Sequence, residues 1–184
     1  RLLYNKYPFA AWHGLLVPEP LREHPQRLEQ ELHLYAWHLA EALGTRLAGF
    51  GLSYNSFGAH ASVNHLHFQT FVRCAPFPVE SGHWRHAGGE AEYPADCVVF
   101  DDALEAWLHL QALHGRGEPY NLLYRPGRLY CLARRHQGSV PLAPWLAGQA
   151  WYEMAGGVVA GSRADFDALG EEAIAAELRK SRPR

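Results

Sequence analysis

The feature that most limits how this chain can fold is a pair of apolar segments separated by a three-residue turn. Residues 120–124 and 128–133 have strand length, and Arg125-Pro126-Gly127 between them has the composition of a turn. This pattern predicts a β-hairpin, whose two strands run antiparallel. Further apolar segments of similar length predict short strands at residues 13–17, 49–55, 63–74, 97–100 and 151–159.

Helical periodicity is confined to three segments. Residues 24–43 carry apolar side chains at intervals of three or four and are followed by Gly44, which predicts a helix that ends there. A second helix is expected after Asp101 as its N-terminal cap, and a third over residues 165–180. Together these elements predict an α+β fold, with a mainly antiparallel β-sheet and helices packed on one side.

The length of 184 residues suits a single domain over residues 1–184. Within it, residues 75–94 are rich in Pro, Gly and His and predict an irregular excursion, either a lid or a surface loop at its centre. Residues 161–184 are expected to form a C-terminal helix and tail.

Charge and cysteine usage exclude several classes of protein. The 17 Lys and Arg residues nearly balance 19 Asp and Glu residues and form no basic stripe, which argues against a nucleic-acid partner. Three widely spaced cysteines, Cys74, Cys97 and Cys131, indicate neither a disulfide framework nor a zinc ribbon. No apolar run reaches the ~20 residues of a membrane span, and the first twenty residues do not resemble a secretion signal. We therefore expect a cytoplasmic protein with no membrane partner.

Histidine is unusually abundant, with 12 residues, and the segment Asn64-His65-Leu66-His67-Phe68-Gln69 contains the pattern of most interest. On a strand, the alternation would place His65, His67 and Gln69 on one face, about 7 Å apart. Three interpretations compete: a solvated strand face, a metal site completed by other histidines such as His60, or nucleophilic catalysis. In the third, a neutral imidazole attacks phosphorus, while Gln69 donates a hydrogen bond to a phosphate oxygen.

The loop before this segment is small and polar and contains Asn55, Ser56, Gly58 and Ser62. Such a loop lets a phosphate approach backbone N–H groups, although by itself it is also compatible with an ordinary turn. Beside the histidine segment, it favours phosphate chemistry.

Residues 53–69 as a whole closely resemble the histidine-triad (HIT) superfamily, in the branch that carries HxHxQ in place of three histidines. Within that branch they are most similar to the GDP-hexose phosphorylases, which act on GDP-D-glucose or GDP-L-galactose, and next to the diadenosine tetraphosphate phosphorylases. Flanking segments resemble these enzymes too, at residues 5–8, 13–18, 77–80, 93–94 and 119–123. The eukaryotic GDP-hexose phosphorylases are longer than this chain, and residues 81–92 have no counterpart that we can place.

The resemblance implies roles for individual residues. His67 would be the nucleophile that forms a covalent nucleotidyl-histidine, His65 would orient it, and Gln69 would bind the transferred phosphate. The candidate substrate-binding residues are Asn5, Asn55 and Ser62, from the resemblance, and Ser56, Gly58, Asn64 and Arg73, from their positions around the motif.

The implied activity is that of a nucleotidyltransferase of the phosphorylase type. Its substrate would be a nucleoside diphosphate sugar resembling a GDP-hexose, or a dinucleoside polyphosphate, and inorganic phosphate would be the acceptor. No cofactor or metal site is required, and a divalent cation such as Mg²⁺ would be an auxiliary for the substrate's phosphates. A homodimer is expected by analogy alone. A HIT-type nucleotide hydrolase and a non-catalytic nucleotide-binding protein of the same fold remain as alternatives, and the sequence does not specify the base or the sugar.

Overall fold

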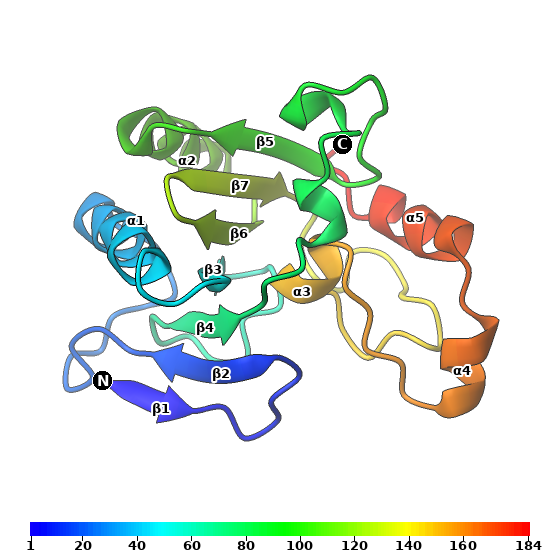
Figure 1. Cartoon of the computed structure of the whole chain (residues 1–184), viewed down its shortest axis with the longest axis horizontal. Coiled ribbons are helices and arrows are strands. Elements are labelled where there is room, and N and C mark those ends of the chain that lie inside the picture. The colour runs from blue at the N-terminus through cyan, green and yellow to red at the C-terminus, as the bar shows by residue number, and fades with distance from the viewer.

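The computed structural model describes all residues from 1 to 184, and its centre is a seven-stranded sheet (Figure 1). Every neighbouring pair of strands is antiparallel, in the order β1-β2-β4-β3-β6-β7-β5. The strands are β1 (Leu2–Tyr4), β2 (Ala11–Leu16), β3 (Phe50–Asn55), β4 (Phe68–Val72), β5 (Asp96–Phe100), β6 (Tyr120–Arg125) and β7 (Arg128–Ala133). The α+β fold with an antiparallel sheet is confirmed, as is the hairpin formed by β6 and β7.

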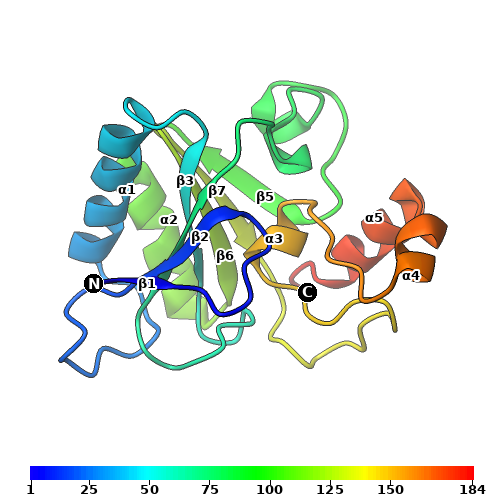
Figure 2. The same cartoon turned by 60° about the horizontal axis from the view of Figure 1, so that its bottom comes forward.

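The two long helices cover one face of this sheet (Figure 2). Helices α1 (Gln30–Gly44) and α2 (Ala103–Arg116) bury Trp37, Leu110 and Leu113 against Leu52, Leu122 and other strand side chains of the larger core. The prediction that helices pack on one side holds only for this pair. On the opposite face, α3 (Trp151–Met154) and α5 (Glu171–Lys180) contribute to a second core around Phe71 and Leu123, and the short α4 (Arg163–Ala168) precedes α5.

The predicted first helix begins six residues later than expected. Pro25 disfavours helical backbone at His24, and Gln26 makes hydrogen bonds to distant segments in place of helical ones. The helix after residue 101 is capped by Asp102 instead of Asp101, through hydrogen bonds from the N–H groups of Leu104 and Glu105 to Asp102 Oδ1.

Two predictions for the C-terminal third are wrong. Residues 151–159 do not form a strand, because α3 begins at Trp151 and Gly156, at φ +90°, ends the helical turn. Residues 165–180 form two helices because the backbone is extended at Leu169 and Gly170.

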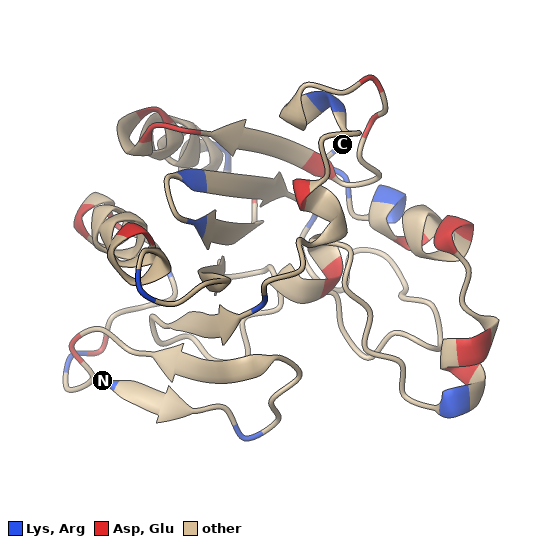
Figure 3. Ribbon diagram, in the orientation of Figure 1, with Lys and Arg blue, Asp and Glu red and all other residues tan.

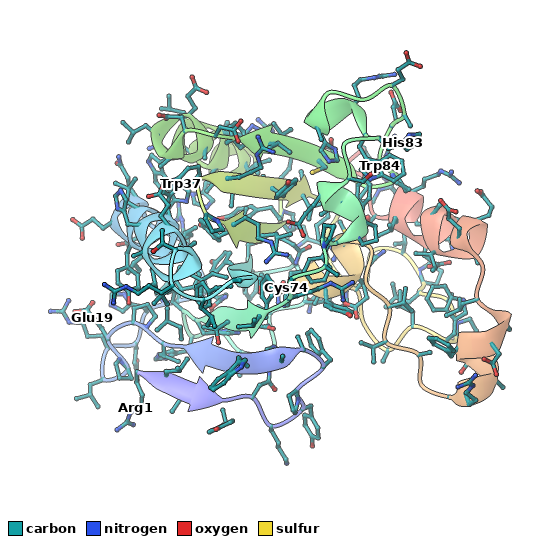
Figure 4. All side chains as sticks on the ribbon, viewed as in Figure 1. Arg1, Glu19, Trp37, Cys74, His83 and Trp84 are labelled. Atoms are coloured by element: carbon teal, nitrogen blue, oxygen red, sulfur yellow. The ribbon has the colours of Figure 1, made fainter.

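The excursion at residues 75–94 contains two short 3₁₀ helices, η1 (Pro78–Glu80) and η2 (Arg85–Ala87). Figure 4 shows His83 and Trp84 within it, and η2 contacts β5, the edge strand four places from β4 in the sheet. Residues 81–92 therefore cover the β5 edge. They are not a lid over the histidine segment.

A largely buried ion pair anchors the excursion to the sheet. Arg125 donates from Nε and Nη2 to the two carboxylate oxygens of Glu80 at 2.8 and 2.9 Å, and from Nη1 to the carbonyl of Gly49. The side chains of Arg125 and Glu80 are only 11% and 12% exposed, and the guanidinium lies over the ring of Phe71. None of the helices combines the length and apolar character needed to cross a lipid bilayer.

We expect Arg125→Met to lower the free energy of unfolding by about 3 kcal/mol, because it leaves the Glu80 carboxylate largely buried without its partner. Urea denaturation followed by circular dichroism measures this loss. The matched control is Arg128→Met, which removes an equally bidentate but exposed pair with Asp101 and should cost less than about 1 kcal/mol. Equal losses in the two variants would contradict the anchoring role.

Candidate active site

The imidazole of His67 is held in the tautomer that a nucleophile requires. Its Nδ1 lies 2.8 Å from the carbonyl oxygen of His65, which can only accept, so Nδ1 carries the proton and Nε2 keeps its lone pair. The side chain is 5% exposed, and this burial lowers the pKa of His67 below its usual 6.5. The ring is thus neutral near pH 7, with one unprotonated nitrogen.

At His67, the side chain of Gln26 makes the backbone hydrogen bonds that a neighbouring strand would otherwise make. Two residues beyond the Ser53–Gln69 pair, the register would bring His67 opposite Asn55, but Gln26 lies between them. Gln26 accepts from the His67 N–H at 3.1 Å and donates to the carbonyls of Asn55 and His67 at 2.8 and 3.3 Å. The strand predicted over residues 63–74 is therefore wrong for residues 63–67, and β4 begins at Phe68.

The carboxamide of Gln69, in β4, has a defined orientation. Its Oε1 accepts two hydrogen bonds of 2.8 Å, one from Nε2 of His13 and one from the indole Nε1 of Trp151. Its NH₂ group has no partner within the protein. A donor group is therefore available on the sheet face that carries Gln69 and Trp151.

A distortion in β2 positions His13. Trp12 has φ +55° at an irregularity in the β2–β4 register, and Thr70 fixes it by accepting from the Gly14 N–H and donating to the Trp12 carbonyl. A Cβ atom at Gly14 would lie 2.9 Å from Thr70 Oγ1, so this position requires glycine. The backbone N–H of Phe9 donates to Nδ1 of His13, which leaves the proton on Nε2.

Of the predicted substrate-binding residues, Asn5 and Asn55 lie close to these groups. Asn5 Nδ2 is 3.0 Å from Nε2 of His13. Asn55 Oδ1 accepts from Asn121 Nδ2 at 2.8 Å and from the backbone N–H of Trp151 at 3.0 Å. Only the amide nitrogen of Asn55 is thus left for a ligand.

The predicted substrate-binding residues Ser56, Gly58 and Asn64 have structural roles in and around the loop. Ser56 Oγ accepts from the buried N–H of Tyr120, and Asn64 Oδ1 accepts from the N–H of Gln26. Gly58 has φ +82°, and a Cβ atom there would lie 2.5 Å from His136 Nδ1. Ser62 is exposed and His65 is half-buried.

Arg73 is not brought to this site. It follows the last residue of β4 whereas His67 precedes the first. The five strand residues between them make six residue steps, which separate the two by about 20 Å. Figure 4 labels Cys74, the next residue, beyond that end of the strand. Arg73 instead lies over the ring of Phe77 and donates to the Ala75 carbonyl.

The site presents hydrogen-bond donors and imidazoles with little formal charge. Figure 3 shows no charged residue on β2 or β4, in agreement with their sequences. No three His, Cys, Asp or Glu side chains form a group able to hold a metal ion. Burial and then the charge of Arg134 lower the pKa of His60, one of the metal ligands considered from sequence, to about 4.

Three residues of this constellation, His13, Gln26 and Trp151, were not among the site residues predicted from sequence. His13 lies in the strand predicted over residues 13–17. Gln26 lies in the segment assigned to a helix, and Trp151 in the segment assigned to a strand. Gln26 and Trp151 act through contacts that join positions 29 to 96 residues apart, and no local pattern signals such contacts.

The fold is that of a known class of enzyme. The structure superposes on yeast Ap4A phosphorylase Apa2 in complex with Ap4A with a TM-score of 0.72 at 17% identity, covering 100% of this chain and 74% of the other. The complex of the same protein with AMP matches with a TM-score of 0.72 over 98% of this chain and 72% of the other. The predicted HIT-like fold is confirmed.

The sequence narrows the relationship further. Residues 2–71 match the family model described as the GDPGP1-like N-terminal domain. The chain is 42% identical over 76 residues to GDP-L-galactose phosphorylase 1 of Arabidopsis thaliana, a match that covers 41% of this chain and 17% of the relative. It is 42% identical over 79 residues to GDP-D-glucose phosphorylase 1 of Homo sapiens, covering 43% and 20%.

A longer match reaches beyond the family-model segment. The chain is 33% identical over 126 residues to GDP-D-glucose phosphorylase 1 of Macaca fascicularis, covering 68% of this chain and 28% of the relative. The predicted resemblance to the GDP-hexose phosphorylases is thus confirmed, over segments that span less than a third of these curated relatives.

We expect the His67 ring to titrate below pH 6.5, because burial disfavours its charged form. The unfolded chain takes up this proton near pH 6.5 and the folded chain only at lower pH, so stability falls as the pH drops below 6.5. NMR titration of the assigned His67 ring measures the midpoint, and the urea-unfolded protein is the reference. A folded midpoint at or above the unfolded one would contradict the prediction.

Gln26→Ala should lower the free energy of unfolding by about 3 kcal/mol, because it removes the partners of the buried His67 N–H and Asn55 carbonyl. Gln137→Ala is the control, since Gln137 also accepts from a backbone N–H, that of His60, but is exposed. Its cost should stay below about 1 kcal/mol when measured by urea denaturation. A Gln26 variant as stable as the control would rule out the bridging role.

Proposed function

We propose that this chain catalyses nucleotidyl transfer from a GDP-hexose to inorganic phosphate, through a covalent bond to His67. The observation that carries the proposal is the pairing of Nδ1 of His67 with the His65 carbonyl, which leaves Nε2 as an unprotonated nucleophile. The free NH₂ group of Gln69 supplies a donor for the phosphoryl oxygen. The similarity to GDP-L-galactose and GDP-D-glucose phosphorylases supports the substrate class.

The reaction proceeds in two displacements. Nε2 of His67 attacks the α-phosphorus, the bond from this atom to the bridging oxygen breaks, and hexose 1-phosphate departs with the electron pair. The ring becomes positively charged, and the His65 carbonyl stabilises it by accepting from Nδ1–H. An oxygen of inorganic phosphate then attacks the same phosphorus, the P–N bond breaks, and GDP leaves neutral His67 behind. Two inversions give net retention at phosphorus.

The proposal also covers the auxiliary cation, the oligomeric state, the cellular setting and the substrate contacts. Any divalent cation assists the phosphates of the substrate, and a homodimer stays a prediction from resemblance. A cytoplasmic setting is supported by the three cysteines, all of which are free. Asn5, Asn55 and the exposed Ser62 are the substrate contacts that the resemblance implies, and Asn55 can contribute only its amide nitrogen.

The test is to incubate the protein with GDP-D-glucose labelled at the α-phosphorus and to isolate an acid-labile protein adduct. His67→Ala should form less than about one-thousandth of the wild-type adduct, because no other group replaces the nucleophile. His38→Ala, which changes an exposed histidine of α1, is the control and should label normally. Equal labelling of His67→Ala would exclude the mechanism.

Further incubations distinguish phosphate from water as the acceptor, and a GDP-hexose from a dinucleoside polyphosphate as the substrate. Release of GDP that requires phosphate identifies a phosphorylase, whereas release of GMP without phosphate identifies a hydrolase. Labelling by Ap4A and not by GDP-D-glucose would favour a dinucleoside polyphosphate, the substrate class that the structural similarity to Ap4A phosphorylase suggests. Nucleotide binding without any adduct would indicate a non-catalytic protein.

A further inference from the structure

The carboxamide of Gln69, two residues after His67, is held by two hydrogen bonds to its oxygen. An amide side chain can rotate by 180° and exchange its oxygen with its nitrogen at little intrinsic cost. One orientation presents two N–H donors to an anionic phosphoryl group, and the other presents a lone pair that repels it. A residue that assists phosphoryl transfer by donation therefore depends on what fixes this rotation.

Two hydrogen-bond donors contact Oε1 of Gln69 and thereby fix which end of the amide is oxygen and which is nitrogen. Nε2–H of His13 and Nε1–H of Trp151 each lie 2.8 Å from it, and an indole nitrogen can only donate. Nδ1 of His13 accepts from the Phe9 N–H, which places the ring proton on Nε2. The amide nitrogen of Asn5, 3.0 Å from this Nε2, is itself a donor and therefore makes no hydrogen bond to it. A rotated amide would turn its NH₂ group toward both donors and lose two hydrogen bonds, which favours the observed orientation by roughly 30-fold.

The two donors are themselves held rigidly. Trp151 is fully buried, stacks on Phe71 with ring centroids 4.9 Å apart, and donates its backbone N–H to Asn55. His13 is 3% exposed and lies under the ring of Phe9, with centroids 4.2 Å apart. Neither donor can leave Gln69 without disrupting the packing of its own ring.

We propose that His13 and Trp151 are positioning residues that lock the Gln69 carboxamide with its NH₂ group directed at the phosphoryl group on His67. This inference rests on the proposed function, since it assigns a role within the same reaction. His13 and Trp151 act only through Gln69 and do not contact the substrate. Trp151 additionally makes the C-terminal part of the chain a component of the site.

The first measurement is the single-turnover rate of adduct formation with α-labelled GDP-D-glucose. Trp151→Phe keeps an aromatic ring but removes the N–H, and it should slow this step about 10-fold. His13→Phe should slow it similarly, and Gln69→Ala about 100-fold. Affinity for the substrate, measured by equilibrium binding, should change less than 3-fold in Trp151→Phe, because the lost orientation matters mainly in the transition state.

The deciding comparison repeats Trp151→Phe in the Gln69→Ala background. If Trp151 acts through Gln69, the second substitution should slow the reaction by less than 2-fold there. Trp107→Phe is the matched control, since Trp107 is also a buried tryptophan but its Nε1 has no partner, and it should leave the rate unchanged. This control separates loss of the hydrogen bond from loss of ring volume.

The outcomes are distinct. A 10-fold loss in both backgrounds would mean that Trp151 acts structurally and would overturn the positioning role, as would no loss in either. Absence of any adduct in the wild-type protein would instead refute the proposed function itself. The folded state of each variant is verified by its urea transition before rates are compared.

Discussion

The candidate site depends on the hydrogen bonds that the side chain of Gln26 makes to the backbone of His67. In a regular sheet, a neighbouring strand would make these bonds. Gln26 satisfies the N–H of His67 and the carbonyl of Asn55 together. The ladder between β3 and β4 therefore opens at its end while the buried N–H of His67 and the carbonyl of Asn55 stay hydrogen-bonded. The same opening lets the chain turn so that the His65 carbonyl reaches the ring of His67.

A buried polar network extends from this point to the far segment of the chain. Asn55 joins Gln26, Asn121 and the backbone of Trp151, and Asn121 in turn accepts from Arg134. Each of these groups is buried, so each hydrogen bond replaces water that cannot enter. The network explains why Asn55, predicted as a ligand contact, is largely occupied by structural partners.

Local patterns predicted the parts of the fold that local forces determine. The hairpin around Arg125-Pro126-Gly127 and the strand ending at Asn55 follow from short apolar segments and turn residues. The His-x-His-x-Gln alternation pointed to the right residues, but for an incomplete reason, because His65 and His67 precede the strand. Their geometry comes from Gln26, whose role requires a contact across 41 residues.

The C-terminal region shows most clearly where the pattern of apolar residues fails to predict secondary structure. Residues 151–159 are apolar enough for a strand, yet Trp151 is satisfied by Asn55, Gln69 and Phe71, all from the sheet. Tertiary contacts thus override local preference there. Arg73 shows the reverse case, since proximity in sequence to the motif does not become proximity in space when an extended strand intervenes.

The place of Trp151 has a consequence for how the fold is divided. The segment that matches the GDPGP1-like N-terminal domain ends at residue 71 and contains His13, His65, His67 and Gln69, so it holds the whole motif. It does not hold the indole that orients Gln69. The segment that this family model matches is therefore smaller than the set of residues that orients Gln69, and a chain limited to residues 2–71 would carry the motif without the indole donor.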